Sequence, residues 1–166
     1  MKKSFNRGFT LIELMIVVAI VAVLTSIAYP AYTSSILKGK RAEGRAALAE
    51  LIQQQERYMT QRNCYLGFST AANGVATAIA STTCGVTTAT AVPFKTFSGD
   101  TLANAAYLLS AEACPSGTAG TNLLMSDCVR VVATPIRTDA EAGTLRITST
   151  GTKDCVNGTN PSVCWK

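Results

Sequence analysis

The chain has 166 residues, a formal net charge of +5 and no histidine. This length predicts one domain with a modest core, and the lack of histidine removes the commonest general base of enzymes. The sequence contains neither a Gly-x-x-x-x-Gly-Lys phosphate loop nor a Gly-x-Ser-x-Gly nucleophile elbow. We therefore expect a protein that is not an enzyme, with no catalytic residues, no cofactor and no metal site.

The N-terminal end combines a short basic leader, residues 1–8, with an apolar run that extends from Leu14 to Ala28. Between them lies the sequence Gly8-Phe9-Thr10-Leu11-Ile12-Glu13. An ionisable residue such as Glu13 is costly inside a membrane-spanning stretch, so by default it marks a functional site with a partner. An ordinary secretory signal peptide is the alternative, but a charge within its apolar region and the position of Gly8 argue against it.

This motif resembles the class III signal of type IV pilins and pseudopilins, in which a prepilin peptidase cuts after the glycine and methylates the new N-terminus. The resemblance covers residues 1–62 and returns weakly in the C-terminal Cys164-Trp165-Lys166, which is similar to the end of PilE-type minor pilins. It implies cleavage between Gly8 and Phe9, N-methylation of Phe9, and an assembly role for Phe9 and Glu13. A membrane anchor with no role in a polymer is the remaining alternative for this segment.

One long helix is predicted from Phe9 to about Met59. Its first half is apolar on all sides, as expected for a helix surrounded by lipid or by other helices. As a helix, residues 9–32 would extend about 36 Å at ~1.5 Å per residue, which is enough to cross a bilayer. The second half is amphipathic, with an apolar stripe at three- and four-residue steps that includes Leu48, Leu51 and Gln55, whereas Arg41, Arg45, Glu56, Arg57 and Gln61 fall largely off it.

The resemblance implies three parts: a prepilin leader (1–8), a transmembrane and polymerisation helix (9–32), and a periplasmic globular head (33–166) that includes the amphipathic half of the helix. The positive charge of the leader is expected to keep that end in the cytoplasm. The expected location is thus the bacterial inner membrane, with a single N-in span, before assembly and the extracellular pilus afterwards.

The head is expected to contain three or four antiparallel strands. Residues 63–106 are rich in Thr, Ala, Ser and Gly without a clear period, which indicates a long irregular loop. Strand-like runs follow at 106–111, 128–134 and 144–150. The predicted fold class is α+β, with the long N-terminal helix packed on a small antiparallel sheet and with loops held by disulfides.

Six cysteines lie after the apolar run. An even number outside the cytoplasm indicates disulfides, although fifteen pairings are possible. The last two cysteines enclose only eight residues, the middle two flank a Gly- and Ser-containing loop between strand-like runs, and the first two are left by elimination. In decreasing order of support, the expected pairs are Cys155–Cys164, Cys114–Cys128 and Cys64–Cys84.

The predicted function is noncovalent polymerisation. The amine of a mature Phe9 is a cation, so it could pair with the Glu13 carboxylate of a neighbouring subunit and fix the register of the two helices. The expected partners are other pilin subunits, the prepilin peptidase, the inner-membrane assembly machinery and the inner membrane itself. Apolar packing between helices would come from Leu11, Ile12, Leu14, Ile16, Val17, Ile20, Val23 and Leu24.

The main hypothesis is therefore a pilus subunit, of the minor type, that serves pilus assembly, adhesion or twitching motility. A pseudopilin of type II secretion is one alternative. A calcium loop would favour that alternative, but the acidic residues available for one are separated in the sequence: Asp127, Asp139, Glu141 and Asp154.

A pilin that binds DNA for uptake is the second alternative. Residues 63–166 contain six basic and six acidic side chains, so this part of the head is neutral, whereas a nucleic-acid-binding domain normally has a clustered basic surface. We therefore predict that DNA is not a partner, and that the head binds it weakly or not at all at physiological salt. Folding could still cluster Lys95, Arg130 and Arg146.

Overall fold

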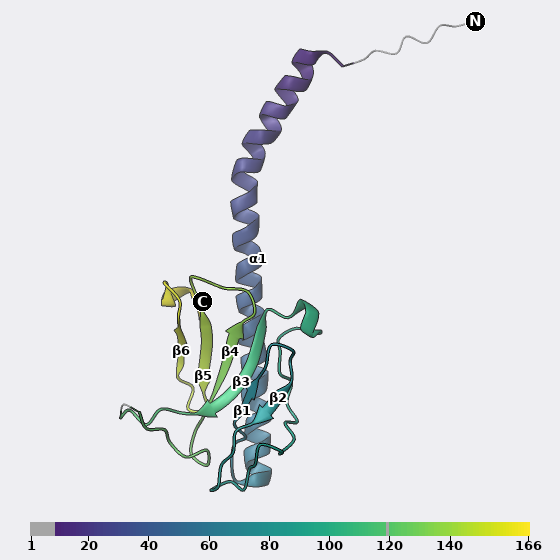
Figure 1. The fold of residues 1–166 in the computed structure, drawn as a ribbon. Coiled ribbons are helices and arrows are strands. Elements are labelled where there is room, and N and C mark those ends of the chain that lie inside the picture. The colour runs from purple at the N-terminus through teal and green to yellow at the C-terminus, as the bar shows by residue number, and fades with distance from the viewer. Residues whose placement is uncertain (1–8, 119) are drawn as a thin grey trace, which may run out of the picture. The chain divides into compact units, whose positions relative to one another are not determined.

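The computed structural model describes residues 9–118 and 120–166, so Gly8 and the rest of the predicted leader lie outside the described residues. One helix, α1 (Leu11–Arg62), opens the described chain (Figure 1). The chain divides into two units, one that ends at Gly39 and one from Lys40 to Lys166, and each is described by itself.

The first unit is the apolar part of α1. Every large apolar side chain from Phe9 to Ile36 is exposed. An 18-residue window of this helix has a mean hydropathy of 2.7, and the helix is long and apolar enough to cross a membrane. The helix continues through Pro30 without interruption.

The second unit is built on a six-stranded antiparallel sheet with the order β2-β1-β3-β4-β5-β6. The sheet consists of β1 (Phe68–Thr70), β2 (Ala76–Ala78), β3 (Tyr107–Ala113), β4 (Val129–Pro135), β5 (Thr144–Thr148) and β6 (Lys153–Val156). Two short 3-10 helices, η1 (Leu102–Asn104) and η2 (Pro161–Val163), complete the elements. The predicted α+β class is confirmed, but the sheet has more strands than expected because two lie within 63–106 and one follows Thr150.

The core of the second unit lies between α1 and the sheet. Alternate residues of β3 are buried, as a strand with one covered face requires. Leu48 and Leu51 of α1 belong to the same buried cluster as Leu109 of β3. Gly44 allows the helix to approach the sheet closely, since a Cβ atom there would lie 2.8 Å from the ring of Tyr107.

The buried face of α1 differs from the predicted stripe most clearly at Arg41. Arg41 was expected to lie off the stripe, but it is only 4% exposed. Its charge is satisfied by carboxylates that lie about a hundred positions away, a contact that helical periodicity does not reveal. Gln55, which was on the predicted stripe, is fully buried and exchanges two hydrogen bonds with the backbone of Leu66.

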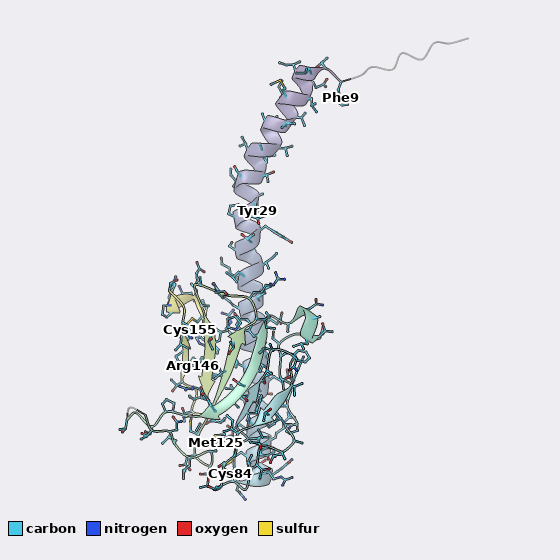
Figure 2. All side chains as sticks on the ribbon, in the orientation of Figure 1. Phe9, Tyr29, Cys84, Met125, Arg146 and Cys155 are labelled. Atoms are coloured by element: carbon cyan, nitrogen blue, oxygen red, sulfur yellow. A yellow bond between two sulfur atoms is a disulfide. The ribbon has the colours of Figure 1, made fainter. Side chains whose placement is uncertain are left out.

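All six cysteines form disulfides: Cys64–Cys84, Cys114–Cys128 and Cys155–Cys164. These are the sequential pairs expected from the cysteine order. The first ties the segment after α1 to the long loop, and the second joins the end of β3 to the start of β4. The third connects β6 to the C-terminal residues, and Figure 2 shows Cys155 on that strand.

Candidate functional site

The predicted assembly residues lie at the first turn of α1. Phe9 precedes the helix and is 84% exposed (Figure 2). Glu13 is in the first helical turn, and its backbone N–H donates to Oγ1 of Thr10 at 3.3 Å. A carboxylate is electrostatically favoured at this end of a helix because the free backbone N–H groups there carry partial positive charge.

Thr10 is a positioning residue that the sequence analysis missed. It caps the helix that carries Glu13, and the spacing Thr10-x-x-Glu13 matches the Ser/Thr-x-x-Glu capping box. That pattern could have identified it. Gly8, the other residue of the predicted cleavage site, lies outside the part of the chain that the structure describes.

Glu13 has no cationic neighbour within its own segment. The sequence contains neither Lys nor Arg between Phe9 and Leu37. A carboxylate in an apolar environment needs a counterion, and no side chain of the described helix up to Leu37 supplies one. The exposed apolar side chains of the same helix likewise require lipid or other helices to cover them.

A second charged cluster lies where α1 enters the second unit. Arg41 donates two hydrogen bonds to Asp139, both at 2.7 Å, and one to Glu141 at 2.8 Å. Asp139 is 4% exposed and also accepts the backbone N–H groups of Glu141 and Ala142. The ion pair therefore fastens the β4–β5 connection to the helix and orders that connection at the same time.

The environment of this cluster shifts three pKa values. The hydrogen bonds from Arg41 lower the pKa of Asp139, and burial only partly opposes the shift. The hydrogen bond to Asp139 correspondingly raises the pKa of Arg41. Burial raises the pKa of Tyr107 to about 12. All three groups thus keep one protonation state near neutral pH, which suits a fixed structural contact and not proton transfer.

The network extends from this cluster to the C-terminal residues. Arg45 donates to the backbone carbonyl of Cys164 at 3.1 Å. The backbone N–H groups of Thr159 and Asn160 donate to the connection between β4 and β5. Gly143 has φ +63°, and a Cβ atom there would lie 2.2 Å from the carbonyl oxygen of Val156, so these loops are in close contact.

The acidic residues considered for calcium do not form one site, whereas two of the three basic residues considered for DNA, Arg130 and Arg146, lie on the neighbouring strands β4 and β5. Asp139 and Glu141 contact Arg41, whereas Asp154 of β6 pairs with Arg146 of β5. In the described chain, no group of three or more acidic, cysteine or histidine residues is placed to hold a metal ion. Of the three basic candidates, Arg130 pairs with Glu112 on the sheet. Lys95 instead lines a groove beside α1.

Comparison with known families identifies the chain. Residues 30–141 match the model described as "Type IV minor pilin ComP, DNA uptake sequence receptor". The chain belongs to this family of type IV minor pilins. Residues 3–29 of the pilin also match the prokaryotic N-terminal methylation motif, which includes the predicted cleavage and assembly residues Gly8, Phe9 and Glu13.

Two curated relatives support this assignment over part of the pilin. The type IV major pilin protein PilA of Myxococcus xanthus is 41% identical over 64 residues, which are 39% of this chain and 29% of PilA. The type IV major fimbrial protein FimA of Dichelobacter nodosus is 57% identical over 42 residues, which are 25% of this chain and 26% of FimA. The matches thus span less than a third of each relative. No solved structure matches the chain.

Proposed function

We propose that this chain enters a type IV pilus as a minor subunit by pairing Glu13 with the mature N-terminal amine of a neighbouring subunit. The observation that carries the proposal is the position of Glu13 at the first turn of an exposed apolar helix. Removal of residues 1–8 would create an amine at Phe9, four positions before this carboxylate. Each charge would then neutralise the other where neither is stable alone.

The pairing would specify register more than it would add stability. Taking two charges out of water offsets much of their attraction, so the net gain from a buried pair is small. A helix displaced along its neighbour would leave both charges unpaired in an apolar core, and that error is costly. Exposed side chains such as Leu14, Val17 and Leu24 would supply the attraction between helices.

Processing is the first step to test. We expect mass spectrometry of the mature protein to show an N-methylated Phe9 as its first residue, and Gly8→Ser to block the cleavage. The prepilin peptidase and the inner-membrane assembly machinery are the partners that this step implies. A retained leader, or an N-terminus at Tyr29, would contradict the proposal.

Assembly is tested by the amount of subunit in sheared pili. Glu13→Ala should leave cleavage and membrane insertion intact but reduce incorporation at least about fivefold, because the amine of the neighbour loses its counterion. Glu13→Gln should behave similarly, since it keeps the size of the side chain and removes the charge. Glu50→Ala is a matched control, because it removes another carboxylate of α1 far from Phe9. Normal incorporation of Glu13→Ala would refute the pairing.

A second candidate function, DNA binding by the head, is favoured by the description of the family model that matches residues 30–141. In this reading the pilus would present the head, and the head would contact double-stranded DNA through several phosphate groups. The neutral charge of residues 63–166 predicts weak binding to the backbone. A receptor for a particular sequence would then depend on contacts with the base edges.

A gel-shift titration of the head, residues 33–166, separates the two candidates. At about 150 mM salt, a receptor should prefer one duplex over a shuffled duplex of the same composition. A pilus subunit without a role in uptake should bind both duplexes equally weakly or not at all. Absence of binding even at low salt would eliminate the second candidate and leave the first unaffected.

A further inference from the structure

The face of the sheet opposite α1 carries two arginines on neighbouring strands. We call this surface the outer face, and in its centre it contains Ser110, Glu112, Arg130, Val132, Arg146 and Asp154. Its residues alternate with those buried against α1, such as Leu109, Val131 and Leu145. Figure 2 labels Arg146 on β5.

The strand register places the two arginines diagonally across one strand pair. Arg130 of β4 lies opposite Thr148, and Arg146 of β5 lies opposite Val132. Diagonal neighbours of this kind on one face are about 7–8 Å apart. Val132 between them is only 8% exposed although it is on the outer face, as expected where long side chains lie across a surface.

Each arginine is held by one carboxylate on the adjacent strand. Arg130 pairs with Glu112 of β3 at 2.9 Å, and Arg146 pairs with Asp154 of β6. The arginine side chains are 17% and 18% exposed, whereas the carboxylates are 46% and 47% exposed. The two carboxylates are therefore the more accessible members of the two ion pairs, and their displacement would open the guanidinium groups to another anion.

A phosphodiester has the chemistry to make this exchange. The planar guanidinium group binds carboxylate and phosphate oxygens in the same bidentate manner. Each carboxylate is nearly half exposed and a phosphate would keep the arginine paired, so replacing the carboxylate disturbs the fold little. The hydroxyl group of Ser110 lies on the same face, opposite Val132, and is suited to bind a phosphate oxygen.

We propose that the outer face binds the phosphate backbone of DNA through Arg130 and Arg146, and that Glu112 and Asp154 are competing anions that limit this binding. The proposal rests on the second candidate function, DNA binding by the head. In the free protein the two ion pairs make the face neutral, so an isolated phosphate gains little. A DNA strand that presents two phosphates together displaces both carboxylates at once, and the carboxylates thereby reduce nonspecific binding.

The test uses the full-length chain in detergent micelles and a fluorescently labelled duplex, with binding measured by anisotropy at about 100 mM salt. Glu112→Gln combined with Asp154→Asn should bind at least about fivefold more tightly than the unmodified chain and show a steeper dependence on salt. Arg130→Gln combined with Arg146→Gln should bind at least about fivefold more weakly and show a shallower dependence. A purely structural role of the ion pairs predicts no gain in the first variant.

Two matched controls separate a local effect from a change in net charge. Glu50→Gln with Asp100→Asn also removes two carboxylates, from the groove beside α1. Arg57→Gln with Arg62→Gln removes two exposed arginines from the end of α1. Both controls should change affinity less than about twofold, because distant exposed charges are screened at this salt concentration.

Each outcome has one meaning. The assignment of the outer face would be overturned if the control variants changed the affinity as much as the outer-face variants. It would also be overturned if the unmodified chain bound DNA and neither outer-face variant changed the affinity. Both results would leave DNA binding by the head intact. Absence of binding in the unmodified chain and in the carboxylate variant would overturn both. Circular dichroism checks that all variants remain folded.

Discussion

The two units of the chain use opposite kinds of contact. Up to Gly39 the side-chain hydrogen bonds are local, as in the Thr10 cap of the first turn, and the apolar side chains are exposed. From Lys40 onward, contacts join distant positions, and Arg41 and Asp139 are 98 positions apart. The first unit therefore depends on lipid or other subunits to bury its apolar surface. The second unit instead buries its core and pairs its buried charges within one chain.

The family matches divide along a similar line. The methylation motif covers residues 3–29, and the minor pilin model covers residues 30–141. A processing signal has to be recognised before the chain is assembled, so it must be encoded in a short contiguous sequence. The contacts of the head need not lie close in the sequence, because folding brings distant residues such as Arg41 and Asp139 together.

The largest effect on the stability of the second unit is expected at Arg41, and it tests whether this unit depends on contacts between distant residues. Arg41→Gln should lower the free energy of unfolding of the second unit by about 3–5 kcal/mol, because Asp139 would remain buried without its partner. Urea denaturation with the disulfides intact measures the loss. Adding Asp139→Asn should recover part of it, and Arg57→Gln on the exposed face is the control. A cost below about 1 kcal/mol would show that water replaces the arginine.

A smaller effect is expected at two glycines with positive φ. Gly143 (φ +63°) and Gly151 (φ +87°) both have a backbone conformation that Ala adopts only with strain. Only Gly143 also faces another backbone, because an added Cβ atom would lie 2.2 Å from the carbonyl oxygen of Val156. Gly143→Ala should therefore cost about 1–3 kcal/mol more than Gly151→Ala. Thermal unfolding compares them, and equal costs would mean that the loop around Val156 adjusts freely.

In the acidic range, part of the dependence of stability on pH should come from Asp139. The pKa of Asp139 is lowered in the folded state from an ordinary value of 3.8. Its contribution is therefore complete above that value and is lost as the pH falls through the lower, folded-state pKa. Below about pH 4 the unmodified protein should lose stability more steeply than Asp139→Asn, which lacks the titrating group. Parallel profiles from pH 5 to pH 2 would contradict this assignment.

The smallest effect on folding is expected in the first unit. Ile16→Ala combined with Val17→Ala should change the unfolding free energy of the second unit by less than about 0.5 kcal/mol, because neither side chain contributes to its core. Incorporation into pili should nevertheless fall, since in the proposed assembly the same side chains would pack between subunits. A lower unfolding free energy of the second unit, measured in detergent, would show that the two units are coupled. It would contradict the view that they are stabilised independently.

Local patterns were sufficient for several features of this pilin. The apolar run predicted α1, strand-like runs predicted β3, β4 and β5, and cysteine spacing with elimination predicted the three pairs. The strands β1 and β2 were missed because each has three residues, too few to show a period, and they depend on pairing with each other and with β3. The cap at Thr10 was encoded locally but was overlooked.

The sequence by itself determined the processing motif and the long helix, because both depend on residues that are adjacent or one helical turn apart. Only the tertiary structure decided that Arg41 is buried against Asp139, and that Arg130 and Arg146 are diagonal neighbours held by carboxylates. Helical periodicity placed Arg41 on the solvent-exposed face, because the period describes the helix alone and not the elements that pack against it. Ion pairs between distant elements depend on strand register and loop geometry, and neither is visible in the spacing of charges along the chain.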